Sequence, residues 1–263
     1  MFDVMISKTL RDGRRGLVGF VAGTALVAVM YAAFYPQVAD GAMEQTVQGF
    51  SPGLREALRM DDLASAAGYL GSSVFGIIVP LIAVGYGITV GTRAVAGDEE
   101  AGHLDLLLAH PVSRTRLVLA RFAALAAGAL LIAGTVWLAM LAIRSGARLE
   151  DISVTEFAAQ CAALALLTIA FGTIALTVGA VTGNRAVTLG VTAGIAVLSY
   201  ATRTMAGLVG VDGLRHLSLF QYYDGGEPLR HGFQWGHLAA LVGVTALLLA
   251  AAVRAFDRRD LTS

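Results

Sequence analysis

The chain has 263 residues, and its 19 Lys and Arg balance 19 Asp and Glu, so the formal net charge is zero. Hydrophobic residues make up 56% and charged residues 14% of the sequence, against roughly 45–50% and about 25% in a typical soluble domain. The mean hydropathy is +0.70. This composition is typical of a membrane protein, and without a basic excess it gives no reason to expect nucleic acid as a partner.

The sequence carries no motif for catalysis or cofactor binding. Cys161 is its single cysteine, which excludes a disulfide framework within the chain. There is no Gly-x-x-x-x-Gly-Lys-Ser/Thr phosphate loop, and no cluster of His, Cys and carboxylates has metal-ligand spacing. We therefore expect no catalytic residue, cofactor or metal in this chain, and no hydrolysis of ATP by the phosphate-loop route.

The predicted elements begin with a short amphipathic helix at the N-terminus. Phe2, Met5, Ile6 and Leu10 recur at helical spacing, and polar residues occupy the opposite side. Such a stripe is typical of a helix that lies in the membrane interface. We predict an interfacial helix over residues 1–15, with a short frayed tail as the alternative.

Six apolar segments follow, each long enough to cross a bilayer core, which needs about 20 residues per helix. None contains Asp, Glu, Lys or Arg in its interior. The sequence therefore predicts an all-α integral membrane protein, with one transmembrane domain over residues 1–263. The predicted spans are residues 16–35, 69–92, 122–143, 157–181, 186–202 and 237–253.

The distribution of basic residues predicts the orientation. With both termini on one face of the membrane, that face holds twelve Lys and Arg and the opposite face holds seven. Basic residues are enriched in cytoplasmic loops. We therefore expect a plasma (inner) membrane protein whose termini, 93–121 loop and 254–263 tail are cytoplasmic.

The loop at 93–121 is more ordered in pattern than a plain linker. Acidic residues and a glycine come first, and then a Leu-rich run that is predicted to be a helix over Leu104–Ala109. Pro111 ends this helix, because the residue before a proline disfavours the α region. Leu104, Leu107 and Leu108 form an i, i+3, i+4 face that suits an apolar groove on a partner protein. The alternative is that these leucines lie against the bilayer surface and the acids are solvated.

The segment before the last span is rich in aromatic residues. Leu217, Ser218, Phe220, Tyr222 and Tyr223 lie within seven positions of one another. Because Tyr, Phe and Trp are favoured at membrane interfaces, the simplest interpretation is an aromatic belt.

These features together resemble the permease subunits of ABC-2 type transporters, which have six transmembrane helices. The resemblance rests on the N-terminal helix, the Glu-x-x-x-Gly-x-Leu-x-Leu-Leu-Leu-x-x-Pro-x-Ser-Arg pattern of the 93–121 loop, the Leu-Ser-x-Phe-x-Tyr-Tyr segment and the ending from Phe256 to Leu261. It implies that two permease subunits pair, as a homodimer or heterodimer, and that each docks one cytoplasmic ATPase subunit that holds ATP and Mg. The docking residues that it implies are Glu99, Glu100, Gly102, Leu104, Leu107, Leu108, Pro111 and Arg114.

The resemblance also implies a substrate pathway at the subunit interface, lined mainly by spans two and five. Because an uncharged lining suits a hydrophobic or amphipathic molecule, we expect export of a drug, lipid or peptide. Two alternatives remain open: a membrane scaffold that binds a cytoplasmic partner through the same loop, and a secondary carrier. The candidate pathway residues are Phe75, Tyr86, Thr89, Thr188, Thr192, Ser199 and Tyr200.

Overall fold

The computed structural model describes residues 13–41, 49–51, 55, 62–63, 65–97, 100, 113–209 and 212–258. Most of the predicted N-terminal amphipathic helix, at residues 1–12, lies outside the described residues. So does the coupling helix predicted over Leu104–Ala109.

The described residues form helices and contain no strand. Two of the elements, η1 and η2, are π-helical and η3 is a 3-10 helix. In chain order the elements are α2 (Arg14–Ala33), α3 (Tyr35–Ala39), α6 (Ala66–Tyr69), η1 (Leu70–Ile78), α7 (Val79–Thr92), η2 (Arg93–Gly97), α10 (Arg114–Ile143), α11 (Val154–Thr182), α12 (Arg185–Val209), η3 (Asp212–Leu217), α13 (Leu219–Asp224), α14 (Pro228–His231) and α15 (Trp235–Arg258).

Six helical stretches in the described part of the chain are long and apolar enough to cross a membrane, as the sequence predicts. Most extend beyond the apolar segments, because helical hydrogen bonding continues through the polar residues at the membrane interface. The six stretches are Arg14–Ala39, Ala66–Gly97, Arg114–Ile143, Val154–Thr182, Arg185–Met205 and Trp235–Arg258.

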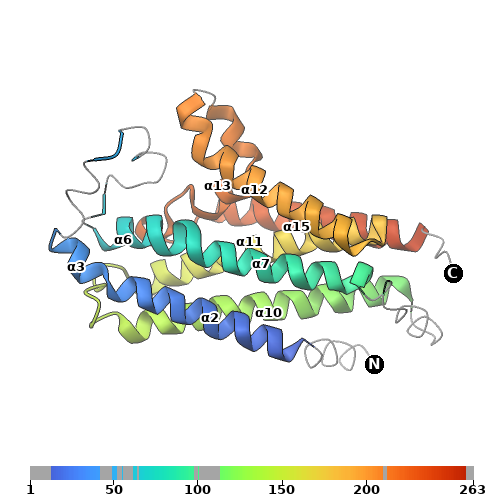
Figure 1. Ribbon diagram of the computed structural model, residues 1–263, viewed down its shortest axis with the longest axis horizontal. Coiled ribbons are helices and arrows are strands. Elements are labelled where there is room, and N and C mark those ends of the chain that lie inside the picture. The colour runs from blue at the N-terminus through green and yellow to red at the C-terminus, as the bar shows by residue number, and fades with distance from the viewer. Residues whose placement is uncertain are drawn as a thin grey trace.

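The helices form a bundle around α11, which packs against α7, α10, α12 and α15 (Figure 1). The start of α2 and the end of α15 lie at one end of the bundle. The end of α7, the start of α10 and the start of α12 lie at the same end. We call this the loop end, because the 93–121 loop leaves and re-enters the bundle there. The opposite end, which carries α3, α6, α13 and α14, is called the far end.

Local capping fixes where the central helices begin and end. Ser153 and Glu156 form a capping box at the start of α11: the Glu156 amide donates to Ser153 Oγ, and the Ser153 amide donates to the Glu156 carboxylate. Gly183 ends α11 with a φ of +62°, a left-handed conformation that glycine adopts without a Cβ penalty. Ser113 caps α10, where its Oγ accepts from the Arg116 amide.

Glycines allow α7 and α11 to pack closely at the centre of the bundle. A Cβ placed on Gly91 would collide with the Gly172 carbonyl and lie 2.8 Å from the Ala175 Cβ. A Cβ placed on Gly87 would likewise meet the Thr168 carbonyl. Small residues permit this close approach of backbones in membrane helices, where packing rather than water drives association.

The outer surface of the bundle is apolar. Large hydrophobic side chains with exposed fractions above half include Leu26 on α2, Leu81 on α7, Leu130 on α10, Leu198 on α12 and Leu247 on α15. In a membrane this surface contacts lipid tails. The least buried of the six stretches is Arg185–Met205, within α12.

Candidate functional site

Two of the eight predicted docking residues, Glu100 and Arg114, lie within the part of the chain that the structure describes. Each belongs to one flank of the 93–121 loop. The other six predicted docking residues lie outside the described residues: Glu99, Gly102, Leu104, Leu107, Leu108 and Pro111.

Glu100 is held by the first residue of α12. The backbone N–H of Arg185 donates to the Glu100 carboxylate at 2.8 Å, across 85 positions of sequence. The first amides of a helix have no partner within the helix, and the helix dipole places partial positive charge on them. The Asn184 side chain satisfies a second amide of this turn, that of Val187, at 2.9 Å. Glu100 therefore joins the first flank of the loop to span five.

Arg114 is held by the last turns of α15. Its Nη1 donates to the Phe256 carbonyl at 3.1 Å, and its guanidinium lies 5.8 Å from the centre of the Phe256 ring. The last carbonyls of a helix lack helical partners and carry partial negative charge, which favours a cation. Beside it, Thr115 Oγ1 donates to the Asp257 carboxylate at 3.0 Å. The second flank of the loop is therefore joined to span six.

A small apolar cluster lies beneath these polar contacts. Val95 of η2 and Leu117 of α10 pack with Leu176 of α11 and Phe256 of α15, and all four are fully or almost fully buried. The two flanks of the loop thus share one core with the ends of α11 and α15. A displacement of either flank has to move these helix ends or break the cluster, because packed interiors leave little free volume.

Three candidate pathway residues lie on span two, and the structure packs two of them within the subunit. The Phe75 side chain in η1 is fully buried. Tyr86 is 3% exposed and its ring meets the Phe20 ring edge-on, with centroids 5.5 Å apart. Thr89 is partly exposed, and its hydroxyl donates to the Gly85 carbonyl of its own helix at 2.7 Å. A pathway role for these residues stays a prediction.

The four candidates on α12 line the side of this helix that faces the rest of the subunit. Thr188 and Thr192 are fully buried, Ser199 is 9% exposed and Tyr200 is partly buried. The Thr188 hydroxyl donates to the Asn184 carbonyl. Thr192 Oγ1 has no hydrogen-bond partner among the described residues. The opposite side of α12 is apolar and exposed, and a pathway role for these four also stays a prediction.

The aromatic segment before the last span connects spans two and five at the far end, which the sequence alone did not predict. Ser218 Oγ donates to the Ser199 carbonyl at 2.6 Å, and the Leu219 amide donates to Ser199 Oγ at 3.0 Å. Tyr223 Oη donates to the Phe75 carbonyl at 2.9 Å. Burial raises the pKa of the Tyr223 phenol well above its usual 10.0, so it remains a donor.

A buried ion pair completes this connection. Arg203 of α12 and Asp224 at the end of α13 lie 2.5 Å apart, with side chains only 9% and 6% exposed. Phe220 packs between the rings of Phe171 and Tyr200. The signal in the sequence was the Leu-Ser-x-Phe-x-Tyr-Tyr motif, but its partners lie on other spans.

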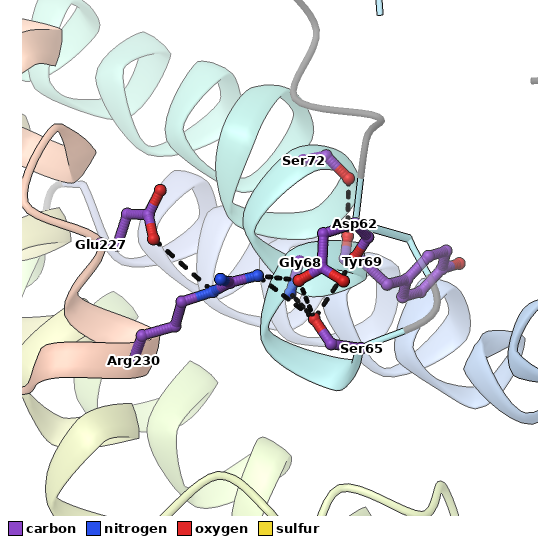
Figure 2. A network of polar contacts seen from close by, with 7 residues as sticks. All are labelled: Asp62, Ser65, Gly68, Tyr69, Ser72, Glu227 and Arg230. Atoms are coloured by element: carbon purple, nitrogen blue, oxygen red, sulfur yellow. Dashed lines mark hydrogen bonds and ion pairs between the residues drawn. The ribbon is translucent and has the colours of Figure 1, made fainter. Parts of the chain in front are cut away.

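Figure 2 shows a second network at the far end, which joins α14 to the start of span two. The Arg230 guanidinium forms an ion pair with Asp62 and a hydrogen bond to Ser65 Oγ at 3.3 Å. Ser65 is also the N-cap of α6, where its Oγ accepts from the Gly68 amide at 3.0 Å. Arg230 is partly exposed and also lies 3.6 Å from the Glu227 carboxylate. The segment between spans five and six therefore contacts the region of span two at two separate points, through Tyr223 with Phe75 and through Arg230 with Asp62.

The described residues include no group of three or more His, Cys, Asp or Glu that could hold a metal ion. In a comparison with protein families, the model described as the ABC-2 family transporter protein matches residues 4–261 of the chain. No curated protein matches the chain.

Proposed function

Because the chain belongs to the ABC-2 transporter family, we propose that it is the permease subunit of an ATP-driven exporter whose ATPase subunits are separate chains. Family membership and six apolar helices make it a multi-pass membrane transport component. Membership also implies partnership with ABC ATPase subunits.

The ATPase docks on the cytoplasmic 93–121 loop. The observation that carries this proposal is that both flanks of the loop are anchored, through Glu100 to α12 and through Arg114 to α15. A docking element has to be attached firmly to the spans that it moves, since a loosely tethered loop would absorb the motion of its partner. The predicted leucine face of Leu104, Leu107 and Leu108 supplies the apolar surface for an ATPase groove.

The substrate is a hydrophobic or amphipathic molecule, and its pathway runs between two paired permease subunits along spans two and five. In support of this route, α7 and α12 contact each other within the subunit, so one surface combines both spans. The exposed side of α12 carries Val191, Ile195 and Leu198. An apolar surface of this kind suits the hydrocarbon part of such a substrate.

Co-purification tests the docking proposal. The permease is expressed with a candidate ABC ATPase from the same organism, and the complex is isolated through a tag on the permease. We expect the ATPase to be retained by the parent and lost when Glu99 and Glu100 are both changed to Lys. A matched control, Glu150→Lys with Asp151→Lys, reverses two acids at the far end and should retain the ATPase. Equal retention by both double variants would refute docking through the acidic flank.

A further inference from the structure

We infer that Glu100 and the pair Arg114–Thr115 are positioning residues that transmit the motion of the ATPase-docking loop to spans five and six. This inference rests on the proposed function and assigns a task to contacts that docking alone does not need. The loop is covalently continuous only with spans two and three. The hydrogen bonds described above extend its reach to α12 and α15.

The first transmission contact joins a side chain to a helix end. The Arg185 amide that Glu100 accepts from is the first N–H of α12. A pull on Glu100 therefore acts along the axis of a 25-residue helix, at the point where its dipole favours an anion. Span five is also poorly held by the rest of the subunit, because only 11% of its apolar window is buried. Its firm contacts lie at its two ends, at Arg185 and at the Ser199 and Arg203 contacts of the far end. A displacement of Glu100 can therefore tilt α12 about its anchored far end.

The second transmission contact joins α10 to the end of α15. Arg114 bonds the Phe256 carbonyl and its guanidinium lies over the Phe256 ring, while Thr115 bonds Asp257 in the next position. Span six is likewise lightly buried, at 17% of its window. The central helix α11, at 72%, is the fixed frame against which both lightly held spans can move.

The chemistry of Glu100 distinguishes this role from direct docking. If Glu100 acts through the Arg185 amide, it needs an acceptor oxygen, which Gln also provides. If it acts through an ion pair with the ATPase, it needs the negative charge, which Gln lacks. Glu100→Gln should therefore keep transmission, and Glu100→Ala should lose it.

The test measures distances within the permease–ATPase complex in lipid nanodiscs by pulsed electron paramagnetic resonance. Spin labels on a Cys161→Ala background occupy exposed positions: Val154 on α11 as reference, with Val197 on α12 or Leu247 on α15. Labelled permease is diluted with unlabelled permease so that the distances are within one subunit. Each pair is measured without nucleotide and with ATP on a hydrolysis-deficient ATPase.

We expect ATP to shift the distance from the reference to α12 in the parent, in Glu100→Gln and in the control Glu150→Ala. In complexes that contain the ATPase, Glu100→Ala should lose this shift and keep the shift of α15. Replacing Arg114 and Thr115 by Ala should give the reverse pattern. An undiminished α12 shift in Glu100→Ala, or a lost α12 shift in Glu100→Gln, would overturn the inference. A parent that binds no ATPase would refute the proposed function itself, and the inference with it.

Discussion

The hydroxyl of Tyr223 donates a hydrogen bond to the carbonyl of Phe75, 148 positions earlier in the chain. Tyr223 lies on the short helix α13 before span six, and Phe75 lies in the π-helical start of span two. Segments of π-helix are rare, and they widen the hydrogen-bond ladder of the helix that contains them. They occur frequently at functional sites. This bond joins α13 to the start of span two at the far end of the bundle.

Replacing Tyr223 by Phe should destabilise the permease by about 1–3 kcal/mol, because a buried carbonyl loses its donor. Unfolding of the purified protein in mixed micelles measures this change. Tyr222→Phe is the matched control, since its hydroxyl bonds the His216 carbonyl at an exposed position where water can substitute. If the two variants lost equal amounts of stability, the buried hydrogen bond to Phe75 would contribute no more than an exposed one.

Breaking the Arg203–Asp224 pair should have a larger effect. Removing one partner of a buried ion pair leaves an uncompensated charge, which costs about 3–5 kcal/mol. We therefore expect Arg203→Met to lower stability more than the double variant Arg203→Met, Asp224→Leu in the same unfolding assay. The exposed pair of Arg148 and Asp40 serves as control, and Arg148→Met should cost about 1 kcal/mol or less. A double variant that is less stable than Arg203→Met alone would contradict this account.

The glycine crossing of α7 and α11 should not tolerate larger side chains. Gly91→Leu forces a side chain against the Gly172 backbone, and overpacking of this kind costs about 1–3 kcal/mol or more. Folded yield and melting temperature in detergent measure the loss. Gly19→Leu on the exposed face of α2 has open space around the new Cβ. It should leave both quantities near the parent values, and a comparable loss there would argue against a steric cause at Gly91.

The Arg230 network should be sensitive to salt, unlike the buried pair. Arg230 and Asp62 are 39% and 48% exposed, so ions screen their attraction. We expect Arg230→Gln to lower the melting temperature slightly at low ionic strength and not at all at high ionic strength. Arg203→Met should lower the melting temperature by the same amount at low and at high ionic strength. An Arg230→Gln deficit that persists at high salt would mean that packing, rather than charge, holds α14 to span two.

The sequence predicted the six spans because each is an apolar run with no internal charge, and hydropathy is a local property. It did not predict that α10 begins at Arg114, eight residues before the apolar segment at Phe122. Ser113 starts that helix by capping, and backbone hydrogen bonding continues through basic residues that hydropathy counts as loop. Helix ends therefore follow capping chemistry, whereas the predicted bounds followed polarity.

The long-range contacts could not be predicted from one sequence. Glu100 was predicted to be a docking residue, and the structure gives its carboxylate the Arg185 backbone amide, a contact that no side-chain pattern reveals. Ser199 was predicted to line a pathway on span five, and that role stays a prediction. Its hydrogen bonds with Ser218 and Leu219 are contacts that the sequence did not reveal. Polar residues within or beside the predicted spans could be found in the sequence. Their hydrogen-bond partners depend on how the spans pack against one another, which a single sequence does not reveal.

The most direct test of the proposed function is ATP hydrolysis by the permease–ATPase complex reconstituted in nanodiscs. The account predicts that the ATPase co-purifies, and that permease with Glu99→Lys and Glu100→Lys alters the hydrolysis rate by releasing the ATPase. It further predicts that changing the phosphate-loop lysine of the ATPase abolishes hydrolysis, because this chain has no phosphate loop of its own. A permease that recruits no ATPase, or a complex whose hydrolysis is indifferent to the two acids, would contradict it.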